Sequence, residues 1–262
     1  MISPGTRSAI SVILAFLMFS LWTADLILLF QLDLAEIPFW IVPLAMLWHA
    51  YVDTGLFITA HDSMHGSILP RHRKLNNLVG VIAVFLYAMF SYKKLRTKHW
   101  EHHRNPATEK DPDFHDGKHK GFFPWYLRFM KKYLTIPQLA GMGIMFGFFT
   151  FVLGVPVQNV ILFWMVPAFL STYQLFYFGT YLPHREPEGG YTNKHRARSN
   201  PYPYFISLAT CYHFGYHLEH HVFPQAQWWL LPRVRSKWKK MKKTVDEFEN
   251  VKGARNKFIK KL

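Results

Sequence analysis

The stretch His217-Leu-Glu-His-His221 decides how the rest of the chain is interpreted, because it places three histidines within five residues. The same spacing occurs in His99-Trp-Glu-His-His103, and His61-Asp-Ser-Met-His65 is a looser relative. If each stretch is helical, residues i and i+4 lie on one face with residue i+3 beside them. The three clusters would then present eight imidazoles in sets that suit zinc, copper, iron or nickel.

A single histidine is more often a surface or core residue than a ligand. Two His-x-x-His-His stretches with a third cluster are hard to explain by packing, so we expect a metal site. Eight or nine imidazoles exceed what one ion binds, whereas two ions with four or five ligands each would leave room for a small molecule. Zinc does not activate oxygen, and no HExxH motif indicates hydrolysis. The spacing therefore favours a pair of irons that uses O2.

Charge is distributed unevenly along the 262 residues, of which 50% are apolar and 18% aromatic. There is no Lys or Arg from residue 8 to 70, and no charged residue from 133 to 184. Apolar stretches of this length are candidate membrane spans. The net charge of +15 could indicate nucleic-acid binding, but the positive-inside rule explains it better, so we expect no nucleic-acid partner. The single cysteine, Cys211, excludes an internal disulfide and zinc sites built from CxxC pairs.

The sequence predicts an all-α integral membrane protein with interfacial helices and a cytoplasmic His-cluster cap that holds two metal ions. Four transmembrane helices are expected at about 9–31, 39–58, 137–153 and 157–182. Residues 76–91 are apolar but short and have basic residues on both sides, so we expect an interfacial or re-entrant helix there. A basic helix over 93–104 would carry the second cluster, and 121–133 resembles an amphipathic surface helix.

Every Lys and Arg after Arg7 falls on one side of this arrangement, and all three histidine clusters come to the same edge of the membrane. We therefore expect the metal site and both termini on the cytoplasmic side. Residues 1–262 are expected to form a single domain, with 233–262 as a basic amphipathic tail. In that tail the apolar residues Trp238, Met241, Val245 and Phe248 recur at helical spacing. The tail could lie on anionic lipid or bind an acidic electron carrier.

Longer strings around the clusters resemble a known family. The three boxes resemble the membrane fatty-acid desaturase and hydroxylase superfamily of di-iron oxygenases. Within it, the chain is most similar to the bacterial and cyanobacterial-type β-carotene ketolases, from His61 to about Pro232. The strings that carry the narrower resemblance are His61-Asp-Ser-Met-His-Gly66, Asp111-Pro-Asp-Phe-His115, Phe178-Gly-Thr-Tyr-Leu-Pro-His-Arg185, His195-Arg-Ala-Arg-Ser199 and Cys211-Tyr-His-Phe-Gly-Tyr-His-Leu-Glu-His-His221 followed by Trp228-Trp229.

The resemblance implies that a further histidine at the end of the last span, His184, completes the ligand set for two Fe ions. The expected ligands are His61, His65, His99, His102, His103, His184, His217, His220 and His221. Further ligands or residues that support the ligands could be His213, His115, Asp62, Glu101, Asp111, Asp113, Thr180 and Glu219. His213 precedes His217 by four residues and would share its helical face. Glu101 and Glu219 lie off the ligand face, as solvated helix charges or as groups that orient an imidazole.

The activity that the resemblance implies is oxidation of the C4 and C4′ methylenes of β-carotene to ketones, with O2 and two electrons per step. Two hydroxylations of one methylene would give a gem-diol, which loses water. Echinenone and canthaxanthin would be the products, and astaxanthin would come from hydroxylated rings. A ferredoxin-type protein is the expected electron donor. The aromatic residues Phe85, Tyr87, Phe176 and Tyr177 could line an apolar channel or simply pack.

Three other functions remain open from the sequence. A β-carotene 3-hydroxylase or a lipid desaturase of the same superfamily would share every ligand named above. A histidine-rich metal transporter would need ionisable residues inside its spans, and the third and fourth predicted spans have almost none.

Overall fold

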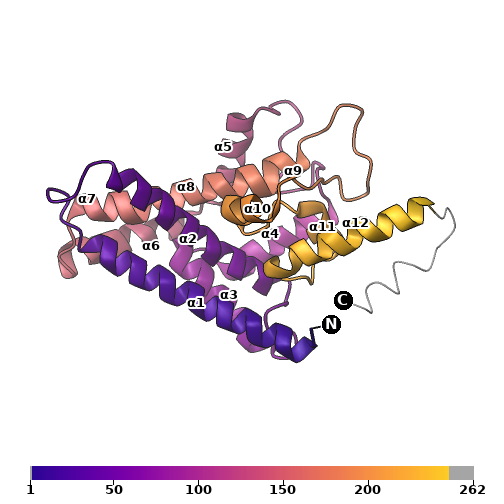
Figure 1. Ribbon diagram of the computed structural model, residues 1–262. Helices are drawn as coiled ribbons and strands as arrows, with labels where there is room; N and C mark the ends of the chain where they lie inside the picture. Colours follow the sequence, from indigo (N-terminus) through magenta and orange to yellow (C-terminus); the bar gives the residue numbers. More distant parts are fainter. Residues whose placement is uncertain (1, 248–262) are drawn as a thin grey trace.

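The computed structural model describes residues 2–247, with side chains as far as Met241, and every regular element within that range is helical (Figure 1). Here η marks π-helical turns, except η4, which is a 3-10 turn. The elements are α1 (Pro4–Phe30), α2 (Ile41–Met64), α3 (Arg73–Ala88), α4 (Tyr92–Arg104), α5 (Phe122–Tyr133), α6 (Ile136–Gly147), η1 (Phe148–Val152), α7 (Val157–Val160), η2 (Ile161–Met165), α8 (Val166–Leu175), η3 (Phe176–Tyr181), α9 (Leu182–His184), α10 (Tyr204–Cys211), α11 (His217–Val222), η4 (Trp228–Leu230) and α12 (Leu231–Glu247).

Three helices are long and apolar enough to cross a membrane: α1, α2 and the continuous helix Val157–His184 that runs from α7 to α9. They match three of the four predicted spans. Two pairs of helices joined at a sharp bend are also long and apolar enough to cross a membrane if each pair is counted as one span. They are α3 with α4, bent by 100°, and α5 with α6 and η1, bent by 85°. The predicted span over 137–153 is one arm of the second pair. The structure thus gives three to five candidate spans, and a total of four stays a prediction.

Helix α2 lies at the centre of the molecule and packs against α1, α3 and α8. Its first turns expose Leu44 and Leu47, as expected of a lipid-facing surface. Most of its second half, from His49 to Met64, is buried. The buried end of α2 therefore brings the first histidine cluster into the interior.

Two carboxylates and a histidine join α1 to α2 inside the predicted spans. The Nδ1 atom of His49 lies 2.7 Å from Oδ2 of Asp25, and Nε1 of Trp22 donates to Oδ1 of Asp53 at 2.7 Å. Ionisable groups at membrane depth are tolerated when they pair with one another. His49 is therefore a packed residue of the α1–α2 contact.

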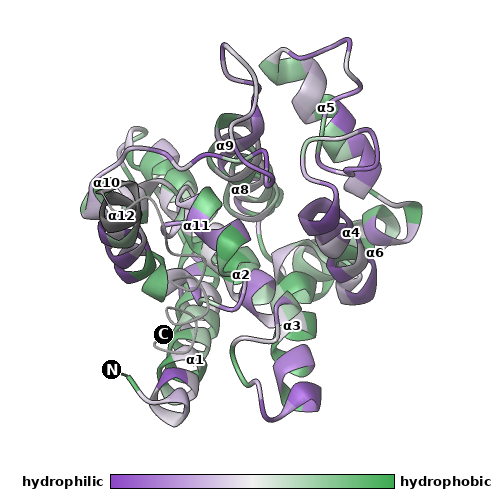
Figure 2. Cartoon of the chain, turned by 90° about the vertical axis from the view of Figure 1, so that its right-hand side faces the viewer, coloured by the Kyte–Doolittle hydropathy of each residue, from purple (hydrophilic) through white to green (hydrophobic). Residues whose placement is uncertain are grey.

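The bend between α3 and α4 determines where the second cluster lies. Helix α3 ends at Ala88 and is followed by Met89, which has a φ of 55°. Ser91 caps the start of α4 by accepting a hydrogen bond from the N–H of Lys94. The two helices are bent by 100° relative to each other, so the polar helix α4, purple in Figure 2, points away from α3. It ends before Pro106, which has no N–H to continue the helix. The helix expected over 76–91, interfacial or re-entrant, corresponds to α3.

The basic tail predicted over 233–262 begins inside α12, where the ring of Trp238 packs against Phe223 at 5.6 Å between centroids. The backbone is helical to Glu247. The remaining predicted tail, including Phe248, lies outside the described residues, and so does the side chain of Val245. The choice between lipid and an electron carrier for this tail stays open.

Candidate metal centre

The first cluster occupies the last turn of α2 and the residue after it. His61 and His65 are four residues apart and point to the same side, with their ring centroids 4.8 Å apart. Gly66 follows with a φ of 68°. This left-handed conformation favours a glycine, which ends the helix after the cluster.

The third cluster forms α11, a helix of six residues that cannot be stable alone. Glu219, within it, is 3% exposed and pairs with Arg235 of α12, with Oε1 and Nη1 2.9 Å apart. The hydroxyl of Ser199 donates to the other oxygen of Glu219 and accepts from the N–H of Leu218. Glu219 is thus a buried anchor for the ligand helix, and not a solvated charge.

His184 reaches the site from the end of the last candidate span. Its Nδ1 lies 2.9 Å from the carbonyl oxygen of Arg196, so the proton on that nitrogen is donated away from the site. Its Nε2 atom is buried and has no hydrogen-bond partner in the described structure. A buried polar atom rarely stays unpaired. This nitrogen faces the other histidines, with ring centroids 4.7 Å from His102 and 4.8 Å from His217.

The nine predicted ligands come together as two adjoining groups. The ligand atoms within each group all lie within 4.8 Å of one another. One group consists of His61, His65, His99, His103 and His220, and the other of His102, His184, His217 and His221. The rings of His103 and His221, one from each group, are 4.3 Å apart.

Within the groups the Nε2 atoms converge. Those of His61 and His103 lie 3.2 Å and 3.0 Å from Nε2 of His220. In the other group, Nε2 of His221 lies 3.1 Å from Nε2 of both His102 and His217. Several lone pairs directed at one point are what a metal ion requires, and imidazole suits iron. The residues present therefore fit two metal ions.

Burial keeps these imidazoles neutral. It lowers the pKa values of His99, His103, His217, His220 and His221 well below 6.5, and neighbouring imidazoles lower them further. A neutral imidazole keeps a lone pair for a metal. His102 differs from them. Burial alone would lower its pKa, but the adjacent Asp111 carboxylate raises that pKa above 6.5.

Two of the supporting aspartates lie behind candidate ligands, and one of them holds its ligand. Both carboxylate oxygens of Asp111 lie 3.0 Å from Nδ1 of His102, and the backbone N–H groups of Ala107 and Asp113 donate to the same carboxylate. This contact fixes the orientation of the His102 imidazole. Asp62 is buried and accepts a hydrogen bond from the N–H of Trp228, while its Oδ1 lies 3.6 Å from Nδ1 of His61, beyond hydrogen-bond distance.

None of the eight other possible ligands belongs to either histidine group, and three of them have different surroundings. His213 does not share a helix with His217, because α10 ends at Cys211 and both Tyr212 and His213 have positive φ values. Its ring is buried against Tyr204 and Tyr216. His115 packs on Trp125, where its Nδ1 accepts from the N–H of Gly117. Glu101 is half-buried and lines a surface groove with Lys94 and Lys98.

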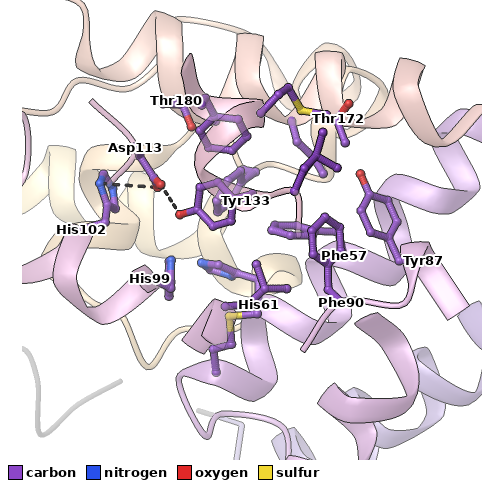
Figure 3. Close-up of a pocket in the computed structure, with 18 of the residues that line it drawn as sticks. Phe57, His61, Tyr87, Phe90, His99, His102, Asp113, Tyr133, Thr172 and Thr180 are labelled. Carbon is purple, nitrogen blue, oxygen red and sulfur yellow. Dashed lines mark hydrogen bonds and ion pairs between the residues drawn. The ribbon is translucent and has the colours of Figure 1, made fainter. Parts of the chain in front are cut away.

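A pocket adjoins the two histidine groups (Figure 3). Four of the candidate ligands, His61, His99, His102 and His217, form one part of its wall. Most of the remaining lining is apolar, including Phe57, Phe90, Phe129, Leu134 and Phe214. Of the four aromatic residues considered for a channel, only Tyr87 lines this pocket. Phe85 is 51% exposed, and both Phe176 and Tyr177 pack on α5.

The fatty acid desaturase family model matches residues 37–145 and 133–248, which contain all nine histidines. The chain belongs to the fatty acid desaturase family. This confirms the resemblance drawn from the three boxes, and the model's range extends beyond the boxes to include α12 as far as Glu247.

Within the desaturase family, the chain is similar to carotenoid ketolases. It is 44% identical over 198 residues to the β-carotene 4-ketolase of Protosiphon botryoides, a match covering 71% of this chain and 49% of the relative. The zeaxanthin 4-ketolase of Chlamydomonas reinhardtii is 42% identical, over 71% of this chain and 42% of the relative. The β-carotene ketolase of Paracoccus sp. (strain PC1) is 42% identical over 208 residues, 79% of this chain and 84% of the relative. The matched stretch thus spans about half the length of the two algal relatives.

Sequence reasoning on this desaturase-family chain missed several supporting residues. Arg235 was counted only as part of the basic tail, and Ser199 only as the end of a motif. Tyr133, at the end of the predicted surface helix, donates to Asp113 in the pocket. Only Ser199 could have been found from the sequence. It ends the string His195-Arg-Ala-Arg-Ser199, which is specific to the resemblance, and a serine there suggests a supporting role because serine is not a typical metal ligand.

Proposed function

We propose that this chain is a di-iron oxygenase that converts the ring C4 methylenes of β-carotene to ketones. The observation that carries the proposal is the junction of two all-histidine groups with an apolar pocket, in a chain similar to named carotenoid ketolases. Two Fe ions held by the five-histidine and four-histidine groups would supply O2 activation, with O2 as co-substrate. The neutral ligands would leave the positive charge of the ions uncompensated.

The pocket supplies binding and orientation for a substrate that has no charge. Aromatic and aliphatic side chains surround the volume next to His61 and His217, so a ring entering there loses contact with water. Each hydroxylation consumes one O2, two electrons and two protons, and releases one water. A second hydroxylation of the same carbon gives a gem-diol, which loses water to leave the ketone. Echinenone, canthaxanthin and, from hydroxylated rings, astaxanthin are the proposed products.

The proposed orientation puts the metal centre and both termini on the cytoplasmic side. The basic residues of α3, α4 and α12 support it, because cytoplasmic segments carry an excess of Lys and Arg. The ring substrate would then enter from the lipid, and the electrons from the aqueous side.

The proposed electron donor is an acidic, ferredoxin-type protein that docks on α4. The ring of Trp100 is half-buried and lies 5.1 Å from His65 and 5.7 Å from His103, so it links two candidate ligands to the surface. Arg96 and Arg104, four residues before and after it, lie on the same helical face. Within residues 2–241 no carboxylate forms an ion pair with either arginine. Unpaired cations around such an entry point would attract an anionic partner.

The test is expression of the full chain in cells that accumulate β-carotene, followed by pigment analysis and metal analysis of the purified protein. Canthaxanthin and echinenone, with about two irons per chain, are expected. Zeaxanthin would instead identify a 3-hydroxylase. Unchanged β-carotene with altered lipid unsaturation would identify a desaturase. Stoichiometric zinc without an oxygen-dependent product would rule out an oxygenase.

A further inference from the structure

The pocket beside the histidine groups has an unexpected polar wall. Its lining is mainly apolar, as suits a hydrocarbon ring, yet Asp113, Tyr133 and Thr180 face it beside the candidate ligands (Figure 3). Tyr133 donates its proton to Asp113, and Oδ2 of Asp113 lies 3.7 Å from Nδ1 of His102. With its proton engaged, the Tyr133 oxygen can still accept a hydrogen bond from a molecule in the pocket.

Thr180 belongs to the same wall of the pocket (Figure 3). It lies about one helical turn before His184, whose ring packs against that of His102. Thr180 is 9% exposed, and its hydroxyl has no hydrogen-bond partner among the described residues. Thr172, in the same pocket, is different, because its hydroxyl donates to the Phe169 carbonyl and contacts the Tyr126 hydroxyl.

When a substrate displaces water from the pocket, a hydroxyl there that lacks a protein partner costs free energy unless the substrate pairs with it. An unsubstituted β-ionone ring has no group that could do so. A ring that carries a hydroxyl could both donate to Tyr133 and pair with Thr180. The carbon that reacts must lie near the metal ligands, and Thr180 and Tyr133 both adjoin those ligands. A hydroxyl that pairs with these two residues is therefore on the reacting carbon or on the next ring carbon.

We propose that Thr180 and Tyr133 hydrogen-bond to a hydroxyl on the ring carbon adjacent to the one that is oxidised. These two residues thereby set the preference of the chain for hydroxylated over unsubstituted rings. The inference rests on the proposed carotenoid ketolase function, and it assigns the residues that discriminate between two substrates of that reaction.

The test uses purified iron-loaded protein in lipid nanodiscs, with β-carotene and zeaxanthin supplied together. The ratio of the two product fluxes gives the ratio of kcat/KM values. Thr180→Val removes the hydroxyl but keeps the shape of the side chain. It should lower the ratio of kcat/KM for zeaxanthin to kcat/KM for β-carotene about 2- to 10-fold. Thr180→Ser should restore the ratio, and Tyr133→Phe should lower it in the same direction. Thr172→Val is the matched control, and should leave the ratio unchanged because that hydroxyl is already paired.

A binding measurement separates recognition from catalysis. Under argon and without reductant, quenching of tryptophan fluorescence gives the two dissociation constants, and their ratio should shift in Thr180→Val by the same factor. An unchanged ratio in both Thr180→Val and Tyr133→Phe would overturn the inference, and so would an equal loss with both substrates, which would mean that Thr180 only supports His184. If the unaltered chain makes no ketone from β-carotene, the proposed function itself is wrong.

Discussion

The Nδ1 atom of His102 lies 3.0 Å from both carboxylate oxygens of Asp111, and its Nε2 lies 3.1 Å from Nε2 of His221. One side of this imidazole is therefore fixed by a carboxylate while the other faces the four-histidine group. The carboxylate is fixed in turn by two backbone N–H groups. This arrangement holds the ring orientation and raises the basicity of the nitrogen directed at a metal.

Asp111→Asn should therefore weaken metal binding. The substitution keeps the size of the side chain but removes its charge, and we expect iron affinity to fall about 10- to 100-fold in a chelator competition on purified protein. The matched control is Asp116→Asn, which alters an Asp–His pair of similar geometry at the surface, with Oδ2 2.8 Å from Nδ1 of His119. Equal losses from the two variants would show that Asp111 has no special role.

His217→Ala should remove iron from the four-histidine group. The His217 ring packs against those of His184 and His221, 4.8 Å and 4.7 Å away. Its loss leaves three ligands in that group. Iron should fall from about two to about one ion per chain or fewer, and ketone formation should stop. His72→Ala, on an exposed histidine at the start of α3, should change neither quantity. An active His217→Ala protein with full iron content would refute the ligand assignment.

The spacing of the histidines was enough to predict that the clusters converge, but not how they divide between two groups. His102 and His103 are adjacent in sequence, yet they belong to different groups. The same is true of His220 and His221. Successive residues on a helix point about 100° apart, so each pair spans the gap between two centres. Which residue faces which centre depends on how α4 and α11 pack, and this is a tertiary property.

Other differences arise where a helix ends earlier than its pattern suggests. The expectation for His213 assumed a helix that continues to His217, but two residues with positive φ interrupt it. The ion pair of Glu219 could not be predicted from its own helix, because its partner Arg235 comes from α12. Apolar length, in contrast, predicted α1, α2 and the helix Val157–His184 well, because the hydrocarbon thickness itself sets that length.

The metal-free protein should lose stability as the pH falls below about 6.5. In the unfolded chain the histidines titrate near 6.5, whereas in the fold burial lowers the pKa values of several, among them His99, His103, His217, His220 and His221. Below 6.5 the unfolded state therefore binds more protons than the folded state. The stability that these histidines contribute is complete above 6.5 and is lost as the pH falls toward their lowered pKa values. The raised pKa of His102 acts in the opposite direction, but it is one group against several.

The measurement is the Tm of chelator-treated protein at about pH 7.5 and about pH 5.5. His220→Gln should reduce the fall in Tm between these conditions, because it removes one buried imidazole. His72→Gln should not reduce it, since that residue is exposed. A metal-free protein that is equally stable at both pH values would contradict the prediction.

Arg96→Gln with Arg104→Gln should weaken the docking of an acidic ferredoxin. Removing two unpaired cations from one face of α4 should slow association about 10-fold at low salt and flatten its dependence on ionic strength. Surface plasmon resonance against the intact membrane protein measures both effects. The control pair Lys110→Gln with Lys118→Gln removes the same charge from exposed positions in the loop after α4. An equal effect of the control pair would mean that overall charge, and not this face, attracts the donor.

Trp100→Leu should slow electron transfer into the metal centre without weakening donor binding. The indole contacts two candidate ligands of the five-histidine group and reaches the surface between the two arginines, so its removal lengthens the gap from donor to metal. Trp100→Phe keeps an aromatic ring and should retain most of the rate. Stopped-flow reduction by ferredoxin measures the effect, and reduction by dithionite, a small molecule that needs no docking face, is the internal control. If both reductants slow equally, or if iron content falls with the rate, Trp100 serves the structure of the site and not electron entry.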